Sequence, residues 1–452
     1  MNSIIVPQLE NRAARKEKLS NFFSSSTVAA AFMVIAAIAA VIVANTDLYS
    51  PIQDFLSTFI GVYAGGHQVG LSIELFVNDL LMTIFFLMIG IELKYEMTVG
   101  ELTDPKAAAL PMFAALGGVA VPALIYFGFN SVMPGGELHG WAIPMATDIA
   151  FALGVMALLG DKVPHGAKVF FTTLAIADDI VAIIVIALFY GSSPQMMWLL
   201  ASAFCVVVLI VFNKMRIYRL WPYLLMGVVL WVCVFNSGIH ATIAGVVLAF
   251  CIPAKPMVML DELPKFASEK MRLANEAYIP DAHPMSQKEY AAHVAEVEKA
   301  SHYAQPPLIR LEHALNTFSN FVVLPLFAFF NAQIRLVGVD LGALVTSPVT
   351  LGVFLGLLIG KPIGIFSVTF ALVKAKVADL PRNVTWFHIA GVGILAGIGF
   401  TMAILIAGLA FSDEAATTGA KTAILSASVV AAVIGLIFLS IDAKIHPAKK
   451  AG

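Results

Sequence analysis

The sequence predicts an all-α polytopic membrane protein with about twelve transmembrane helices. The chain is 60% hydrophobic and only 12% charged, about half the charged fraction of a soluble domain. Apolar stretches recur from residue 25 to residue 441, and most are long enough to cross a hydrocarbon layer of about 30 Å. Basic residues gather in alternate connections between these stretches. Each span must be helical, because a helix satisfies its own backbone polar groups in lipid.

The predicted spans differ in length, and the shortest are candidates for partial crossings. Their approximate ranges are 25–44, 72–99, 107–130, 141–160, 167–190, 195–213, 220–236, 239–253, 310–331, 349–373, 384–411 and 418–441.

The distribution of lysine and arginine indicates an even number of spans, because cationic side chains are retained in cytoplasmic connections. Of the 27 basic residues, 24 lie in the two termini and the even-numbered connections. The odd-numbered connections hold only Arg335 and Lys421, and Lys361 lies inside the tenth span. Both termini are therefore expected on the cytoplasmic side.

The same pattern divides the chain into successive parts. These are a cytoplasmic N-terminus at 1–24, spans 1 to 8 at 25–253, a cytoplasmic insertion at 254–309, spans 9 to 12 at 310–441 and a cytoplasmic C-terminus at 442–452. The insertion is rich in Lys, Glu, His and Ala and is expected to form short helices. It is too small and too polar for a catalytic domain, so no enzyme activity is expected.

Other compositional signals exclude several function classes. Cys205, Cys233 and Cys251 all fall in predicted spans without metal or redox spacing and are expected to be buried small hydrophobic residues. The net charge of −2 gives no indication of nucleic-acid binding, and no cofactor is expected. The first span lacks a small-residue cleavage pattern and follows a basic flank, which is typical of a retained helix.

Four ionisable residues stand out near the middle of predicted spans: Asp148 in the fourth, Asp178 and Asp179 in the fifth, and Lys361 in the tenth. Each costs about 2.5 to 3.5 kcal/mol at the centre of an inserting helix, so the set costs roughly 10 to 14 kcal/mol. A buried structural ion pair between Lys361 and one aspartate is the alternative reading. It leaves two acids without an explanation, which favours a functional site.

The adjacent pair Asp178 and Asp179 predicts a site for protons or a small cation. Neighbouring residues of a helix point about 100° apart, so both side chains can reach one cavity. Two carboxylates this close in a poorly hydrated site cannot both ionise cheaply. A proton, a small cation or a buried lysine would relieve the repulsion, and carboxylate oxygens suit an alkali cation.

Two spans contain candidate breaks. In WAIPMATDIAFALG, Pro144 interrupts the fourth span, and Thr147-Asp148 is typical of an N-cap that starts a second half-helix. The eleventh span contains GVGILAGIGFT, with four glycines before Thr401. Interrupted helices in corresponding halves of a chain indicate a transporter site built from repeats. In the tenth span, glycines every four residues from 352 to 364 predict a close-packing face beside Lys361.

The segments GWAIPMATDIAFALGV, LAIADDIVAIIVIALFY, LLIGKPIGI and GILAGIGFTMAI resemble signature segments of the NhaA-type sodium/proton antiporter family, and the resemblance covers most of residues 70–440. It implies a pH-regulated, electrogenic antiporter of the bacterial inner membrane that exchanges Na⁺, and also Li⁺, for H⁺ by alternating access. It also implies two inverted repeats, with discontinuous spans 4 and 11 crossing near the midplane. No cofactor is implied; the partners would be the transported ions, membrane lipids and a second copy in a homodimer formed through the connection between spans 1 and 2.

The resemblance also implies roles for individual residues. Asp178 and Asp179 would bind Na⁺ and carry protons, with Thr147 and Asp148 contributing to the site, and Lys361 would pair with Asp178 when no ion is bound. A further set would form the cytoplasmic funnel and the pH response, namely Asp79, Glu92, Glu96, His240, Glu312 and His313.

The chain departs from the family pattern on its regulatory face. Asn316 follows the RLEH motif where relatives commonly carry a second histidine and a tryptophan, and the cytoplasmic insertion is longer than usual. Both departures concern the regulatory face and leave the transport core unchanged.

Two other function classes share some of these features. A sodium-coupled organic anion symporter could have the same architecture, although no arginine lies inside a predicted span to receive an anion. An intramembrane aspartyl protease also needs two membrane-embedded aspartates, but its glycine-aspartate motif is absent and the two acids are adjacent on one helix.

Overall fold

The computed structural model describes residues 25–64, 67–191, 193–337, 340–381 and 383–445. The predicted cytoplasmic N-terminus at 1–24 and residues 446–452 of the predicted C-terminus lie outside these ranges. The chain divides into two compact units, and α5 (Met82–Thr98) runs through both. Unit 1 comprises residues up to Phe85, Glu96–Ser193 and the chain from Thr317 onward, and unit 2 comprises Phe86–Tyr95 and Pro194–Asn316.

Unit 1 contains most of the helices. In its first part these are α2 (Ser26–Ala44), α3 (Tyr49–Ser57), the short α4 (Ile73–Leu75), the π-helical turn η1 (Phe76–Leu81), the 3₁₀ turn η2 (Glu101–Thr103), α6 (Pro105–Val132), the 3₁₀ helix η3 (Leu138–Met145), α7 (Ile149–Ala157), the 3₁₀ turn η4 (Gly160–Lys162) and α8 (His165–Phe189). In its last part they are the π-helical turn η6 (Ser319–Val323), α15 (Leu324–Asn331), α16 (Leu341–Thr346), α17 (Pro348–Leu355), the π-helical turn η7 (Gly356–Gly360), α18 (Lys361–Lys374), α19 (Trp386–Ala396), α20 (Phe400–Ala410) and α21 (Glu414–Ile445).

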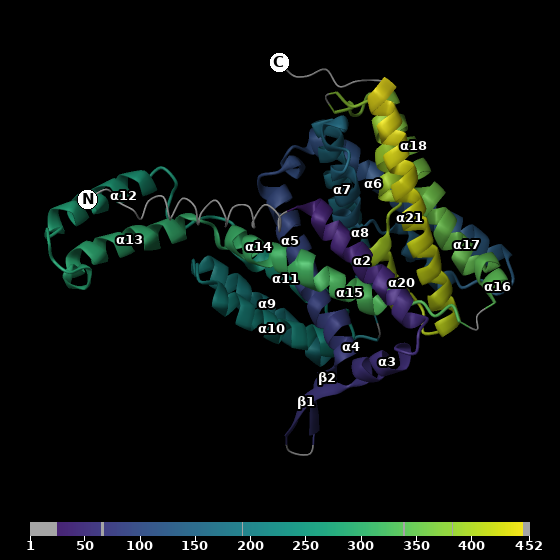
Figure 1. Ribbon diagram of the computed structural model, residues 1–452, viewed down its shortest axis with the longest axis horizontal. Helices are drawn as coiled ribbons and strands as arrows, with labels where there is room; N and C mark the ends of the chain where they lie inside the picture. The colour runs from purple at the N-terminus through teal and green to yellow at the C-terminus, as the bar shows by residue number, and fades with distance from the viewer. Residues whose placement is uncertain (1–24, 65–66, 192, 338–339, 382, 446–452) are drawn as a thin grey trace. The chain divides into compact units, whose positions relative to one another are not determined.

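The core of unit 1 is built around α6 and α21. Helix α6 packs against α8, α17 and α18, and α21 packs against α17, α19 and α20 (Figure 1). Glycines allow the closest of these contacts. A Cβ atom on Gly364 would lie 2.1 Å from the carbonyl oxygen of Gly117, and one on Gly117 would lie 2.4 Å from the carbonyl oxygen of Gly364. The backbones of α6 and α18 therefore touch directly, as the predicted glycine face requires.

Unit 1 also contains a β-hairpin that the sequence reading missed. Strands β1 (Phe59–Ala64) and β2 (His67–Ser72) pair antiparallel, with Phe59 opposite Ser72 and Ala64 opposite His67. The signal was present in the sequence as two short strand-like runs separated by Gly-Gly, a spacing typical of a two-residue hairpin loop.

Unit 2 contains α9 (Met196–Lys214), α10 (Leu220–Asn236), α11 (Ile243–Cys251), α12 (Leu263–Ala277), the 3₁₀ turn η5 (Pro284–Ser286), α13 (Lys288–Ala304) and α14 (Pro307–Phe318). Helices α9, α10 and α11 pack against one another, and α12 packs against α13. The Lys94 ammonium donates hydrogen bonds to carbonyl oxygens at the end of α11, among them that of Phe250 at 2.8 Å. A cation at this position offsets the negative end of the helix dipole.

The described residues support a multi-pass membrane protein. Nine helices in the described ranges are long and apolar enough to span a membrane, and the bent pair α19–α20 makes a tenth. The predicted spans at 220–236 and 239–253 are shorter, because α10 has 17 residues and α11 only 9. The predicted count of about twelve is therefore approximate.

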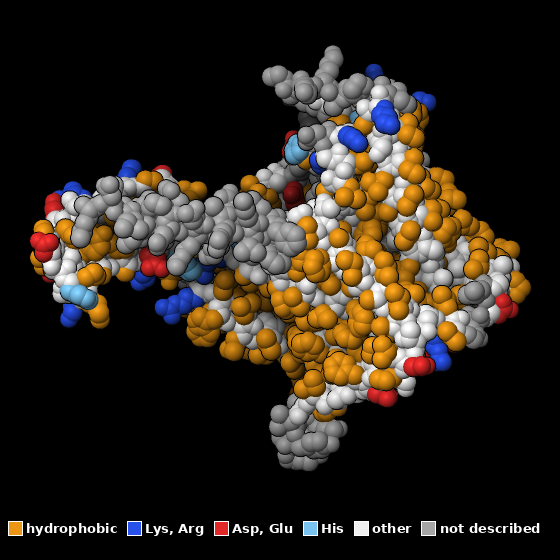
Figure 2. Space-filling view, in the orientation of Figure 1, with side chains coloured by type: hydrophobic (Ala, Val, Ile, Leu, Met, Phe, Trp, Pro, Cys, Tyr) orange, Lys and Arg blue, Asp and Glu red, His pale blue; other side chains and the backbone are white. Residues whose placement is uncertain are grey.

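The surface of unit 1 agrees with this class. Large hydrophobic side chains cover much of the described helical surface (Figure 2). Ile35, Leu124, Leu188 and Ile441 are each more than half exposed. A soluble monomer rarely exposes a continuous apolar surface of this extent, whereas lipid tails solvate it.

Candidate ion-binding site

The four predicted intramembrane charges converge within unit 1. Asp178 and Asp179 lie in the middle of α8, Asp148 precedes α7, and Lys361 is the first residue of α18. Asp148, Asp178 and Asp179 are at most 2% exposed, and Lys361 is fully buried.

The fourth span is broken where the sequence predicts it. Pro144 lies in η3, which ends at Met145, and α7 begins only at Ile149. Asp148 is the N-cap of α7, since its Oδ1 accepts a hydrogen bond of 2.9 Å from the backbone N–H of Phe151. A carboxylate at this position satisfies a free N–H group and offsets the positive end of the helix dipole.

The eleventh span is also broken, between α19 and α20, with a bend of 45°. The break needs a residue without a side chain, because a Cβ atom on Gly397 would lie 2.6 Å from the carbonyl oxygen of Leu357. The carbonyl oxygen of Ile398, inside the break, accepts a hydrogen bond of 2.7 Å from the backbone N–H of Asp148. The two breaks therefore meet backbone to backbone.

The Asp148 carboxylate joins the two half-helices. Its Oδ2 accepts hydrogen bonds from the hydroxyl and from the backbone N–H of Thr401, the second at 3.1 Å. Thr401 is the second residue of α20, so its N–H is one of the free donors at that helix N-terminus. One carboxylate thus caps both α7 and α20. Sequence reasoning placed Thr401 at the break but missed its contact with Asp148, which joins residues 253 positions apart.

Lys361 is bound to Asp178. The Lys361 ammonium forms a salt bridge with Asp178 Oδ2 and donates a hydrogen bond of 2.9 Å to the hydroxyl oxygen of Thr147. The Thr147 hydroxyl lies 2.7 Å from Asp178 Oδ2 and 3.1 Å from the carbonyl oxygen of Ala396, and can donate to either. Thr147 therefore connects the break in the fourth span, the acidic pair and the end of α19.

The charges of this cluster do not cancel. It contains three carboxyl groups, those of Asp148, Asp178 and Asp179, and one ammonium group, that of Lys361, which also interacts electrostatically with Asp179. Asp178 Oδ1 is buried and has no hydrogen-bond partner among the described residues. A buried site with excess negative charge and an open carboxylate oxygen can accept protons or a small hard cation.

Within the described ranges, no group of three or more His, Cys, Asp or Glu side chains is arranged to hold a metal ion. The three cysteines are buried and free, as expected.

Comparison with known proteins agrees with the geometry. A family profile described as Na⁺/H⁺ antiporter 1 matches residues 20–439. The chain belongs to this family. A Na⁺/H⁺ antiporter NhaA of Wolinella succinogenes is 43% identical over 442 residues, covering 96% of both chains. One of Helicobacter pylori strain G27 is 44% identical over 437 residues, covering 96% of this chain and 97% of the relative.

The resemblance inferred from the signature segments is thereby confirmed, and neither rival function class is supported. Among solved structures, a sodium proton antiporter of Methanocaldococcus jannaschii covers 94% of this chain and 95% of its own, with 13% identity and a TM-score of 0.43. A similarity this low carries no further conclusion.

The predicted funnel and pH-response residues of this antiporter divide between the two units. Asp79 and Glu96 belong to unit 1 and are partly buried. Four lie in unit 2, namely Glu92 on α5, His240 before α11, and Glu312 and His313 on α14. His313 is exposed and the other three are partly buried. Their roles stay predictions.

Proposed function

We propose that this antiporter exchanges Na⁺ for H⁺ at a single buried site formed by Asp178, Asp179 and Thr147, with Lys361 and Asp148 balancing charge. The observation that carries the proposal is the salt bridge between Lys361 and Asp178 in a cluster with three carboxyl groups. Removing the lysine from Asp178 leaves excess negative charge, which a sodium ion or protons must neutralise in so dry a site.

Competition for the acidic pair couples the two ions. Sodium and protons both relieve the repulsion between Asp178 and Asp179, so binding of one expels the other. In the empty site, the Lys361 ammonium takes the place of the cation. Lithium is expected to use the same oxygens, since it is also a small hard cation.

Access to the site would alternate between the two sides of the membrane. The half-helices meet beside the acids, and Asp148 holds their N-termini together. An irregular backbone at this depth is tolerated where it lines a binding site. Movement of these elements would expose the site to each side in turn, and more protons than sodium ions per cycle would make the exchange electrogenic.

Exchange in proteoliposomes tests the site. Asp178→Asn and Asp179→Asn should each abolish sodium-driven proton movement, because a neutral amide neither repels its neighbour nor releases a proton. Asp54→Asn is the matched control, since Asp54 is exposed on α3. Thermal melts must show that both site variants are folded, so that a loss of exchange is not a loss of structure. Near-normal exchange in both would refute the proposed site.

The remaining properties concern the protein in its membrane. We propose an inner-membrane location with both termini cytoplasmic, a homodimer formed through the connection between α2 and α4, and a pH response that involves Glu312 and His313. Cysteine labelling at Lys214 and at Arg335 from each side of the membrane tests the orientation, since the two connections should label from opposite sides. Cross-linking in that connection tests the dimer.

A further inference from the structure

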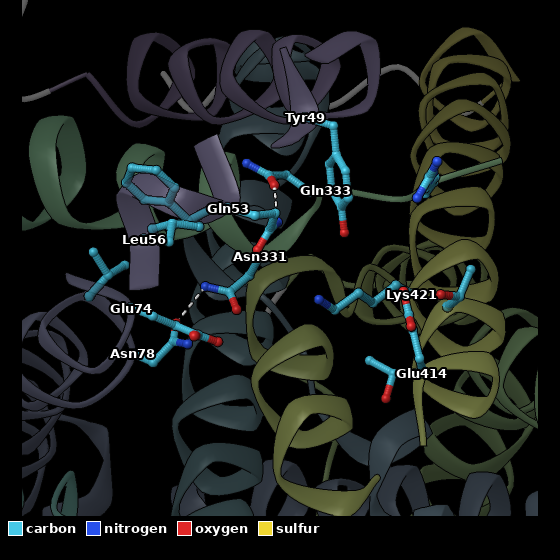
Figure 3. Close-up of a pocket in the computed structure, with 14 residues that line it drawn as sticks. Tyr49, Gln53, Leu56, Glu74, Asn78, Asn331, Gln333, Glu414 and Lys421 are labelled. Carbon is cyan, nitrogen blue, oxygen red and sulfur yellow. Dashed lines mark hydrogen bonds between the residues drawn. The ribbon is translucent and has the colours of Figure 1, made fainter. Parts of the chain in front are cut away.

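A second polar feature of unit 1 is a cavity of about 210 Å³ that shares no lining residue with the ion-binding site (Figure 3). Its walls come from α3, the turn formed by α4 and η1, the segment after α15, and the start of α21. These segments belong to the first, ninth and eleventh connections and the helix ends beside them. The cavity therefore opens at one end of the spans, on the side predicted to be non-cytoplasmic.

Four amide side chains form one wall of the cavity. Gln53 donates a hydrogen bond of 2.8 Å to Gln333 Oε1, and Asn331 donates one of 2.7 Å to Asn78 Oδ1. The bond from Gln53 fixes the orientation of the Gln333 amide (Figure 3). Its nitrogen Nε2 is buried and has no acceptor among the described residues. A buried donor without an acceptor costs about 1 to 3 kcal/mol, so the wall is incomplete without a group that accepts hydrogen bonds.

Lys421 supplies a second set of unused donors. Its side chain extends from α21 into the cavity toward Glu74 (Figure 3). It interacts electrostatically with Glu74, but it forms no hydrogen bond and no ion pair within 4.0 Å with any residue of the described ranges. The two opposite charges thus face each other across a gap rather than in contact.

The placement of these charges is unusual for the chain. Only two of the 27 basic residues lie at the ends of spans predicted to be non-cytoplasmic: Arg335 in the ninth connection and Lys421 near the start of α21, and both line this cavity. Arg335 lies over the ring of Tyr49, 5.4 Å from its centre. Carboxylates at Glu74 and Glu414 complete the lining. The cavity is therefore polar and carries both signs of charge.

The separation of the charges selects the ligand. A simple anion would satisfy Lys421 but would face the carboxylate of Glu74, and a simple cation would satisfy Glu74 but would face the ammonium of Lys421. A molecule with an oxyanion at one end and an ammonium at the other satisfies both walls, because charge-assisted hydrogen bonds form at each end. A volume of about 210 Å³ admits a molecule of that kind.

We propose that this cavity binds a small zwitterion, with its oxyanion on Lys421 and its primary ammonium group on Glu74. The same chemistry occurs in a phospholipid headgroup that carries phosphate and amine and in a free solute of similar size. The site is separate from the exchange chemistry, so its test measures binding and not transport.

Thermal stabilisation of the purified, delipidated protein tests the charge requirement. The probes are O-phosphoethanolamine, which carries both charges, and inorganic phosphate and ethanolamine, which carry one each. Only the first should stabilise the protein in a saturable way. Lys421→Ala and Glu74→Gln should each weaken its apparent affinity about tenfold or more, because each removes a charge-assisted contact. Lys214→Ala, at an exposed position on α9, should bind like the unmodified protein.

Native mass spectrometry from nanodiscs distinguishes the two sources. Retention of phosphatidylethanolamine but not phosphatidylglycerol by the unmodified protein, lost in Glu74→Gln, would assign the site to a lipid headgroup. Saturable binding of the free probe without lipid retention would assign it to a solute. The proposal is overturned if no probe and no lipid binds, if phosphate alone binds as well as phosphoethanolamine, or if Glu74→Gln changes nothing. Glu74 is exposed, so this variant should fold even where Lys421→Ala does not.

Discussion

Asp148 is expected to stabilise the crossing of the two broken helices, and the structure gives the magnitude. Asp148→Ala removes the acceptor of three donors, which are the N–H of Phe151 and the N–H and hydroxyl of Thr401. The site is 2% exposed, so little water is available to replace the carboxylate. A buried donor left without an acceptor costs about 1 to 3 kcal/mol, which predicts a loss of about 3 to 6 kcal/mol after partial relaxation.

A double-mutant cycle isolates the contact between Asp148 and Thr401. Thr401→Val removes only the hydroxyl, a donor to a charged group, and should cost about 1.5 to 3 kcal/mol. If the two side chains stabilise the protein through their mutual hydrogen bond, the double variant should lose about 1 to 3 kcal/mol less unfolding free energy than the sum of the single losses. The measurement is the free energy of unfolding in mixed detergent micelles titrated with a denaturing detergent.

The control for this cycle is Thr369→Val. Thr369 is as buried as Thr401, but its hydroxyl donates to the carbonyl oxygen of Ile365 within its own helix, at 2.7 Å. Its loss should add to that of Asp148→Ala without coupling. A coupling energy within about 0.3 kcal/mol of zero for the Asp148 and Thr401 pair would refute the inference that this carboxylate joins the half-helices.

Three further outcomes are expected. Lys361→Met should cost about 3 to 5 kcal/mol of stability at neutral pH and less in acid, where protonation discharges its carboxylate partner; equal losses at pH 8 and pH 5 in thermal melts would contradict the pairing. Gly364→Ala should destabilise the protein and reduce exchange, because a Cβ atom would collide with backbone 2.1 Å away. Its control is Gly128→Ala, where a Cβ atom would meet nothing within 4 Å; this variant should be neutral or stabilising by up to about 1 kcal/mol. The hydrogen bond from Lys270 lowers the pKa of Glu296 below its ordinary 4.5. This carboxylate therefore stabilises the contact of α12 with α13 above pH 4.5 and loses that effect as pH falls through its folded pKa. Spin-label distances between the two helices should lengthen in acid, and in Glu296→Gln they should no longer depend on pH.

Hydrophobic composition and basic-residue placement were sufficient to predict the helical membrane class and most of the spans. The two breaks were also predicted, because Pro144 and the glycines around residue 397 disfavour a continuous helix. The range 239–253 was a candidate for a partial span, and α11 is short, although apolar composition does not reveal where a helix of 9 residues ends. The β-hairpin was not predicted, although its two strand-like runs are present in the sequence.

The candidate site could be predicted as a set of residues but not as a set of contacts. The free-energy cost of placing charged side chains in lipid was sufficient to single out Asp148, Asp178, Asp179 and Lys361 from the sequence. The bond from Thr401 to Asp148 spans 253 residues, and no local pattern encodes such a pairing. The resemblance implied the pairing of Lys361 with Asp178, and the salt bridge is present; its part in transport stays a prediction.

The π-helical turn η7 immediately precedes Lys361. It keeps the glycines before and after it on the same face of the span. Four residues overshoot an α-helical turn by about 40°, so glycines at every fourth position would drift around a regular helix and leave α6. A wider turn from Gly356 to Gly360 rotates the chain back, and Cβ atoms on Gly352, Gly360 and Gly364 would all still meet α6.

The position of Lys361 is therefore set by the count of residues as well as by their identity. Deleting one residue from the regular helix before the wide turn, in residues 348–355, would rotate everything after it by about 100°. The ammonium would then point away from Asp178 although every charged residue was still present in the sequence. An insertion or deletion in residues 348–355 should consequently be far more harmful than any single conservative substitution there, whereas a one-residue deletion in residues 356–360 that restores a regular turn should keep Lys361 near its present phase.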